Sequence, residues 1–229
     1  DRVLSTWERR ASMTLTRELK RRGVNVIART AVDRVDTGAN LGATVHYRQG
    51  DSDEDRTAYG EVVLAAIGRV PNTDADWFRS SGLKLDERGY VTVDGYGRTN
   101  LDGVWALGDI TPGHALAHRA FEQGITIAEK IAGADPKPVL DDTVPQVVFS
   151  FPEAASVGLT LDQAKAREDV VEPKETAYPM LSNARMLMSG EGGSMTVVSG
   201  AFANNPDMQV VLGVHIVSPI ASDLIAEAE

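Results

Sequence analysis

Hydrophobic residues change their spacing along the chain, and the changes predict successive elements. Over residues 7–22 apolar positions recur at helical spacing, as at Leu15 and Leu19, and Gly23 follows as a stop. Three strand-like runs come next, at residues 24–27, 44–47 and 62–65. The acidic stretch 51–56 predicts a solvated hairpin tip between the last two runs. This first region indicates part of an α/β nucleotide-binding domain.

A second region predicts a strand at 90–93 and a short buried strand over 103–109 that ends in Gly108-Asp109. Helical spacing follows over residues 116–131 and stops at Gly133. The pattern therefore places a carboxylate near a helix N-terminus, and this combination suits a polar cofactor. Residues 132–138, with two prolines, are the clearest linker.

The third region, from about residue 139, alternates strands and short helices. We expect strands around residues 146–149, 175–178, 195–198 and 210–217, with helices near 161–167 and 221–229. This order predicts an α+β domain in which an antiparallel sheet carries its helices on one face.

Composition and charge narrow the possible functions. The 229 residues are 42% hydrophobic, with a formal net charge of −10 and no cysteine. Such an acidic chain disfavours nucleic acid and anionic membrane surfaces as partners. No apolar run approaches the length of a membrane span, and no signal peptide can be read, so we expect a cytoplasmic protein.

Several motifs resemble one protein family. Residues 103–109, preceded by Arg98-Thr99, are similar to the second flavin-binding motif of the FAD-dependent pyridine-nucleotide disulfide reductases. Residues 65–73 (AAIGRVPNT) resemble the family's A-x-G-R-x-P-N-T segment. Three further segments are most similar to the lipoamide dehydrogenase branch: residues 116–120 (LAHRA), 144–149 and 152–158. The resemblance continues at 178–185 and 212–219, and so covers nearly the whole chain.

The resemblance implies a fold in three parts. Residues 1–72 would be the carboxyl part of an NAD-binding domain, residues 73–138 a returning segment of an FAD-binding domain, and residues 139–229 an interface, or dimerisation, domain. Residues 191–209 depart from the family's compact hairpin, because residues 204–207 lengthen the turn. The family's Gly-rich loops, redox-active Cys pair and tail His-Glu are absent from the sequence. We therefore expect a carboxyl-half fragment that has no catalytic residues, no turnover and negligible FAD affinity by itself.

The resemblance also assigns residues to FAD. Asp109, exposed by the adjacent Gly108, would accept a hydrogen bond from the ribityl chain, whereas the residue pair alone favours a turn or an N-cap. Leu116, Ala117 and His118 would present backbone N–H groups to the pyrimidine edge of the flavin. The His118 side chain could be catalytic, a bystander to a backbone contact or a surface group, and we do not assign it as a base.

Two residues are assigned to NAD in the same way. The backbone at Gly68 would approach the nicotinamide end, although a simple turn before Pro71 explains the glycine as well, and Val32 would pack on the adenine. Ser5 stands where NADP-using relatives carry an arginine for the 2′-phosphate, which favours NAD.

The function implied is that of a flavoprotein disulfide oxidoreductase. The complete enzyme would oxidise protein-bound dihydrolipoamide with NAD, through a Cys pair and FAD. It would act as a homodimer, with a 2-oxoacid dehydrogenase complex as a candidate partner. Alternatives are a mycothione or glutathione-type reductase, a mercuric reductase, a transhydrogenase, a quinone reductase, or a dimerising scaffold without redox chemistry.

Overall fold

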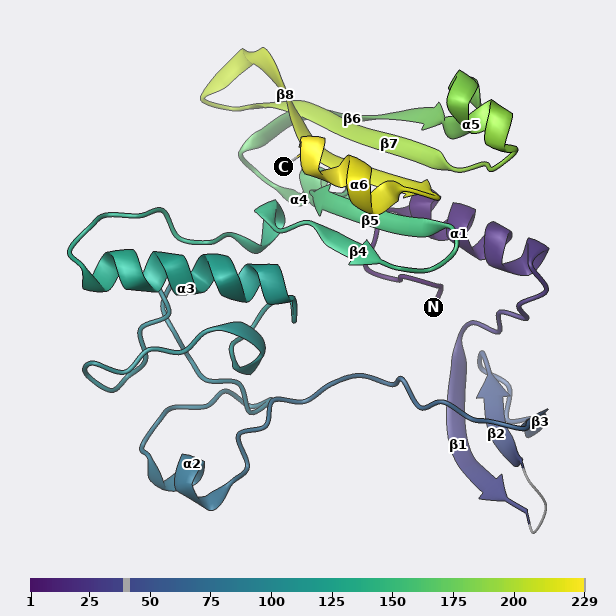
Figure 1. Cartoon of the computed structure of the whole chain (residues 1–229), viewed down its shortest axis with the longest axis horizontal. Helices are drawn as coiled ribbons and strands as arrows, with labels where there is room; N and C mark the ends of the chain where they lie inside the picture. Colours follow the sequence, from purple (N-terminus) through teal and green to yellow (C-terminus); the bar gives the residue numbers. More distant parts are fainter. Residues whose placement is uncertain (39–41, 229) are drawn as a thin grey trace. The chain divides into compact units, whose positions relative to one another are not determined.

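The computed structural model describes residues 1–38 and 42–228 (Figure 1). Contacts within the chain divide it into two compact units. The first consists of Asp1–Ile67 together with Val147–Ala228, and the second of Gly68–Gln146.

A five-stranded sheet is the centre of the first unit. Its strands run in the order β4-β5-β8-β7-β6, and the pairs β5/β8, β8/β7 and β7/β6 are antiparallel, as the sequence predicts. The bounds are β4 Gln146–Val148, β5 Glu153–Gly158, β6 Val170–Pro179, β7 Ser194–Phe202 and β8 Asn205–Ser218. The hydrophobic pattern does not predict β5, because its small residues Ala154, Ala155 and Ser156 lack the bulky β-branched pattern typical of strands.

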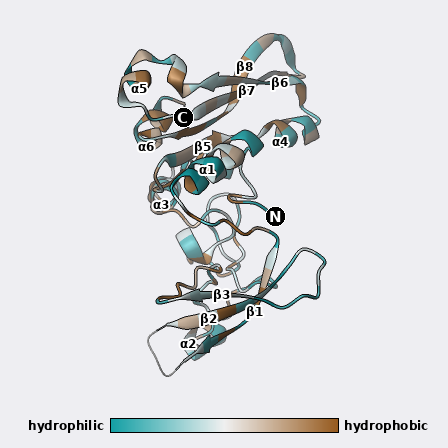
Figure 2. Cartoon of the chain, turned by 90° about the vertical axis from the view of Figure 1, so that its right-hand side faces the viewer, coloured by the Kyte–Doolittle hydropathy of each residue, from teal (hydrophilic) through white to brown (hydrophobic). Residues whose placement is uncertain are grey.

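Helix α1 (Arg9–Arg21) covers one face of this sheet. The Glu8 carboxylate starts the helix by accepting hydrogen bonds from the backbone N–H groups of Arg10 and Ala11. Leu15 packs with Trp7 and Ala11 against Ala154 and Val217 of the sheet. The helical spacing predicted this amphipathic element, whose remaining surface is mostly hydrophilic (Figure 2).

The opposite face of the sheet is covered by α6 (Ala221–Leu224) and the 3₁₀ turn η4 (Ile225–Ala228), which pack on Ala155 and Ile216. Helix α4 (Leu161–Ala166) instead packs with Val198, on the α1 side. The expectation that the helices share one face is therefore wrong. Neighbouring residues Ala154 and Ala155 point to opposite faces and both are fully buried, so both faces need a cover. The last residue of the predicted terminal helix, 229, lies outside the described residues.

Between β6 and β7 the chain forms the 3₁₀ turn η3 (Met180–Ser182) and helix α5 (Ala184–Ser189), neither of which the hydrophobic pattern predicts. The Asn183 side chain caps α5 and Gly190 ends it in the left-handed conformation. The lengthened turn at residues 204–207 becomes the start of β8, whose pairing with β7 is interrupted by two register shifts.

The first unit also contains a separate three-stranded antiparallel sheet, formed by β1 (Thr30–Thr37), β2 (Ala43–Gln49) and β3 (Arg56–Gly60). Strand β2 confirms the run predicted at 44–47. The runs at 24–27 and 62–65 form no strands, which corrects the prediction. Val62 and Leu64 are almost fully exposed, and no described strand pairs with their segment to satisfy its backbone.

In the second unit, α3 (Ala117–Ile131) confirms the predicted helix. The short helix α2 (Asp76–Ser80) buries Phe78 with Val91 and Ala106. The predicted strands at 90–93 and 103–109 are reduced to single bridges, Leu85 with Val91 and Arg98 with Trp105.

Two tight turns explain the loss of these strands. The carboxylates of Asp86 and Asp94 each accept two backbone N–H groups of the turn that follows, and Gly89 and Gly97 close the turns at positive φ. The chain therefore reverses too often for a longer ladder. The apolar run ends not as a strand but in the 3₁₀ turn η1 (Gly108–Ile110).

Candidate cofactor-binding site

Gly108 fixes the turn η1 against helix α3. Its N–H donates to Oε1 of Gln123 at 2.8 Å, and its carbonyl accepts from the hydroxyl of Thr111 at 2.8 Å. The glycine has φ +73°, and a Cβ at this position would come within 3.3 Å of the Cβ of Ala120. Glycine is therefore required both by the backbone conformation and by the close approach of η1 to the helix.

Asp109, held by this turn, has an exposed side chain. No hydrogen bond or ion pair of its carboxylate is found within residues 1–38 and 42–228. Asp109 also caps no helix, since the N-cap of α3 is Leu116. The turn places a free carboxylate on the surface beside α3, where it can accept hydrogen bonds from a ligand's hydroxyl groups.

The N-terminus of α3 is uncapped. Leu116 offers no side-chain acceptor, and the first turn carries no acidic residue. The Leu116 N–H donates to the His114 carbonyl at 3.0 Å, and the next backbone donor with an acceptor in the described chain is Ala120, which bonds to the Leu116 carbonyl. The N–H groups of Ala117 and His118 therefore remain free, whereas the predicted N–H donor Leu116 is already engaged. Free N–H groups and the positive end of the helix dipole together favour an electron-rich or anionic group.

The His118 side chain is engaged elsewhere. Its Nε2–H donates to the carbonyl of Pro145 at 2.7 Å, while Gln146 bonds to Nε2 of His114 at 3.1 Å. His118 therefore carries a structural hydrogen bond, and only its backbone is available at the helix end.

The two residues predicted for NAD lie in different units. Val32 is on β1 with 57% of its surface exposed. Gly68 has φ +130°, and no heavy atom lies within 4 Å of the place where a Cβ would stand, so its backbone is open to a neighbour. Of the predicted site residues, the structure thus brings together Gly108, Asp109, Leu116, Ala117 and His118.

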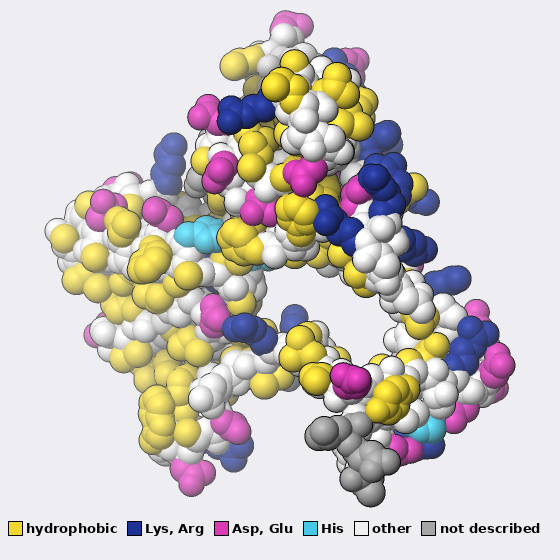
Figure 3. Space-filling view, turned by 45° about the vertical axis from the view of Figure 1, so that its right-hand side comes forward, with side chains coloured by type: hydrophobic (Ala, Val, Ile, Leu, Met, Phe, Trp, Pro, Cys, Tyr) yellow, Lys and Arg dark blue, Asp and Glu magenta, His cyan; other side chains and the backbone are white. Residues whose placement is uncertain are grey.

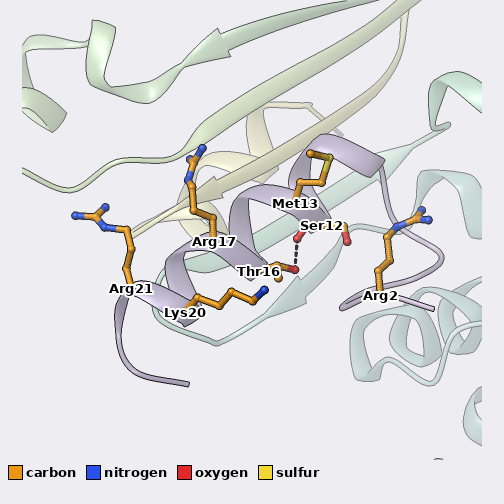
Figure 4. A pocket seen from close by; sticks show the side chains of 7 residues that line it. All are labelled: Arg2, Ser12, Met13, Thr16, Arg17, Lys20 and Arg21. Carbon is orange, nitrogen blue, oxygen red and sulfur yellow. Dashed lines mark hydrogen bonds between the residues drawn. The ribbon is translucent and has the colours of Figure 1, made fainter. Parts of the chain in front are cut away.

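Sequence reasoning did not anticipate a groove of about 630 Å³ along α1 in the first unit, shown in Figure 4. The groove is lined by Arg2, Ser12, Met13, Thr16, Arg17, Lys20 and Arg21. Figure 3 shows that Lys and Arg side chains gather on one side of the face that it draws. Arg17 and Arg21 both pair with Glu18, at 3.4 and 3.0 Å, which offsets part of the positive charge. The groove belongs to a different unit from Asp109.

Sequence reasoning also missed Arg119 and Asp141. The guanidinium of Arg119 is buried beside the site and pairs with Asp141 at 2.6 Å. Nothing in the local pattern connects two residues twenty-two positions apart, so only the fold reveals the pair.

The remaining ionisable groups indicate no metal centre. Within residues 1–38 and 42–228, no group of three or more His, Asp or Glu side chains could hold a metal ion. A hydrogen bond from Arg48 holds the pKa of Asp33 below its ordinary value, but both groups are on the surface of the three-stranded sheet. No helix in the described part of the chain is both long and apolar enough to cross a membrane.

Comparison with known proteins gives a consistent result. The family model described as pyridine nucleotide-disulphide oxidoreductase matches residues 1–124, and the dimerisation domain of the same family matches residues 144–229. A dihydrolipoyl dehydrogenase of Cupriavidus necator is 39% identical over 93% of this chain and 43% of its own length. Another from Geobacillus stearothermophilus is 37% identical over 98% of the chain and 46% of its own length.

Among solved structures, LpdA from Mycobacterium tuberculosis is similar to this chain with a TM-score of 0.81 and 30% identity, over 96% of this chain and 45% of that structure. The chain spans about half the length of the curated relatives it matches. With one family model covering more than half of the residues and its dimerisation domain covering most of the others, the chain belongs to the pyridine nucleotide-disulphide oxidoreductase family.

Proposed function

We propose that this chain is the part of a dihydrolipoamide dehydrogenase that holds one side of FAD and builds the dimer. In the complete protein, protein-bound dihydrolipoamide would be oxidised with NAD as the final acceptor. The observation that carries the proposal is the free carboxylate of Asp109 next to the uncapped N-terminus of α3. The names of the related proteins support the choice of substrate.

The residues of the site fit a flavin. Asp109 would accept a hydrogen bond from the ribityl hydroxyls, a charge-assisted contact that contributes about 1.5–3 kcal/mol. Ala117 and His118 would direct their free backbone N–H groups and the helix dipole toward the pyrimidine edge, with Leu116 as the N-cap residue beside them. When bound, FAD supplies the two-electron chemistry, and the chain supplies orientation and a positive potential for the charge on the reduced ring.

For the nicotinamide cofactor, the proposal assigns Gly68 to the nicotinamide end and Val32 to the adenine. The open backbone at Gly68 and the exposed side chain of Val32 support these roles. Ser5 offers no bidentate cation to a 2′-phosphate, which favours NAD over NADP.

Thiol chemistry and assembly would need groups that this chain does not supply. The sequence contains no cysteine, so the proposal assigns thiol–disulfide exchange with dihydrolipoamide to residues outside it. The dimerisation domain of this chain supports a homodimer. The similarity of the chain to dihydrolipoyl dehydrogenases supports a 2-oxoacid dehydrogenase complex as partner.

The test is anaerobic reduction of the complete protein. Dihydrolipoamide should bleach the oxidised flavin absorbance, and NAD added afterwards should restore it while NADH appears at 340 nm in the assay. A yellow protein that ignores dihydrolipoamide but is bleached by NADH or NADPH would instead be another disulfide, mercuric or quinone reductase, or a transhydrogenase. A colourless protein would favour a dimerising scaffold.

A further inference from the structure

The guanidinium of Arg119 joins three separate segments of the second unit. Its Nε donates to Oδ1 of Asp141 at 2.6 Å, and its Nη2 donates to the carbonyl of Pro112 at 2.6 Å. Arg119 lies in the first turn of α3, Pro112 follows η1, and Asp141 begins the 3₁₀ turn η2 (Asp141–Thr143). One side chain thus ties the helix start to the loop before it and to the segment that leads toward β4.

This joint, formed by Arg119, Asp141 and Pro112, is closely packed. Arg119 is only 5% exposed, and a buried cation in the first helical turn is opposed by the helix dipole unless an anion neutralises it. Asp141 supplies that anion. Gly113 has φ +121°, and a Cβ there would overlap both Nη2 of Arg119 and Oδ2 of Asp141. The ion pair therefore lies directly against a position that only glycine can occupy.

Two further hydrogen bonds continue the joint along the same segments. His118, the neighbour of Arg119, donates to the carbonyl of Pro145, and Gln146 bonds to His114. The segment 141–146 is thus fixed at one end to Arg119 and at the other to His118 and His114. Since α3 has no side-chain cap, these contacts are the side-chain hydrogen bonds that tie residues of its first turn to neighbouring segments.

We propose that the Arg119–Asp141 pair is a positioning device that sets the first turn of α3, and with it the N–H groups of Ala117 and His118, for the flavin. The inference rests on the proposed flavin site. Arg119 acts through the backbone of its neighbours, so it is a positioning residue. Its Nη1 is buried and has no acceptor in the described part of the chain, so the guanidinium is held by its other two nitrogens alone.

The joint itself can be tested in the 229-residue chain, without cofactor. In Asp141→Asn the imidazole ¹⁵N and ¹H NMR signals of His118 and His114 should move, because the segment that carries Pro145 and Gln146 is released. The matched control is Asp102→Asn, an exposed carboxylate of the same unit, which should leave both signals unchanged. If the His118 and His114 signals do not move in Asp141→Asn, the Arg119–Asp141 pair does not hold this segment, and the inference is wrong.

Its role toward the flavin is tested in the complete, FAD-loaded protein. Arg119→Met and Asp141→Asn should each weaken FAD binding tenfold or more and alter the visible circular dichroism of the flavin at saturating FAD. Arg119→Lys, which keeps the charge, should recover part of both effects. The double variant Arg119→Met/Asp141→Asn should lose no more FAD affinity than either single variant, because the two groups act as one unit.

The control for a general loss of stability is Arg88→Met, which removes an exposed arginine of the same unit that lies over the ring of Tyr90 and should leave FAD affinity unchanged. If FAD-loaded Arg119→Met keeps the wild-type FAD affinity and flavin dichroism, the inference is wrong and the proposed function is unaffected. A complete protein that holds no FAD in the wild type would overturn both, and the NMR comparison would still show whether the joint exists.

Discussion

Replacing Leu15 by alanine tests the packing of α1 on the five-stranded sheet. Leu15 is 2% exposed and contacts the cluster that includes Ala154 and Val217. The change removes about three methylene-sized groups at ~0.8 kcal/mol each, and the cavity left behind raises the cost to about 2–5 kcal/mol. Leucine and alanine are both strong helix formers, so the local helix propensity contributes little.

The assay is urea unfolding of the purified chain, followed by the far-ultraviolet signal of helix and sheet. Met13→Ala on the same helix is the matched control, because 61% of the Met13 surface is already exposed, and it should change the free energy of unfolding by less than ~0.5 kcal/mol. A Leu15→Ala variant as stable as Met13→Ala would refute the reasoning, since α1 would then not be packed on the sheet.

Two further predictions concern the same unit. Burial lowers the pKa of His215 below its ordinary value of 6.5, so the unfolded chain takes up a proton before the folded chain does. The contribution of His215 to the free energy of unfolding should therefore be complete above pH 6.5 and be lost as the pH falls from 6.5 toward the lower folded pKa. Melting scans at several pH values should show this slope, and His215→Gln should lack it. Equal slopes in the two proteins would contradict the role of His215. Gly158→Ala should destabilise the chain by about 2–5 kcal/mol in urea unfolding, because Gly158 has φ +79° and a Cβ would meet Gly213 Cα at 2.6 Å. A variant that unfolds at the wild-type urea concentration would show that β5 and β8 approach less closely there.

Helices were predictable where one face is apolar over several turns. The pattern of Leu15 and Leu19 located α1, and the pattern over residues 116–131 located α3, because in both cases the buried side chains recur at helical spacing. Strand prediction failed where the local pattern and the pairing partner disagreed. The run 62–65 is apolar but has no described partner strand, whereas β5 has small residues and is held by its pairing with β8.

Motif resemblance proposes residues for the candidate site, but it says nothing of the framework that holds them. Motif resemblance pointed to Asp109 and to the segment 116–118, and the structure places both at the junction of η1 and α3. Arg119 and Asp141 carry no such signal, because their partnership depends on a loop that returns to the helix from twenty-two residues away.

The central claim, that Asp109 and the first turn of α3 hold a flavin, is tested most directly by FAD affinity in the complete protein. Wild-type protein and Asp109→Ala would be stripped of FAD and titrated with it, with quenching of flavin fluorescence as the readout. Loss of the charge-assisted hydrogen bond should weaken binding by about 1.5–3 kcal/mol, roughly 10- to 150-fold, while Asp102→Ala should bind FAD like the wild type. Equal affinity of Asp109→Ala and wild type, or no binding by either, would contradict the account.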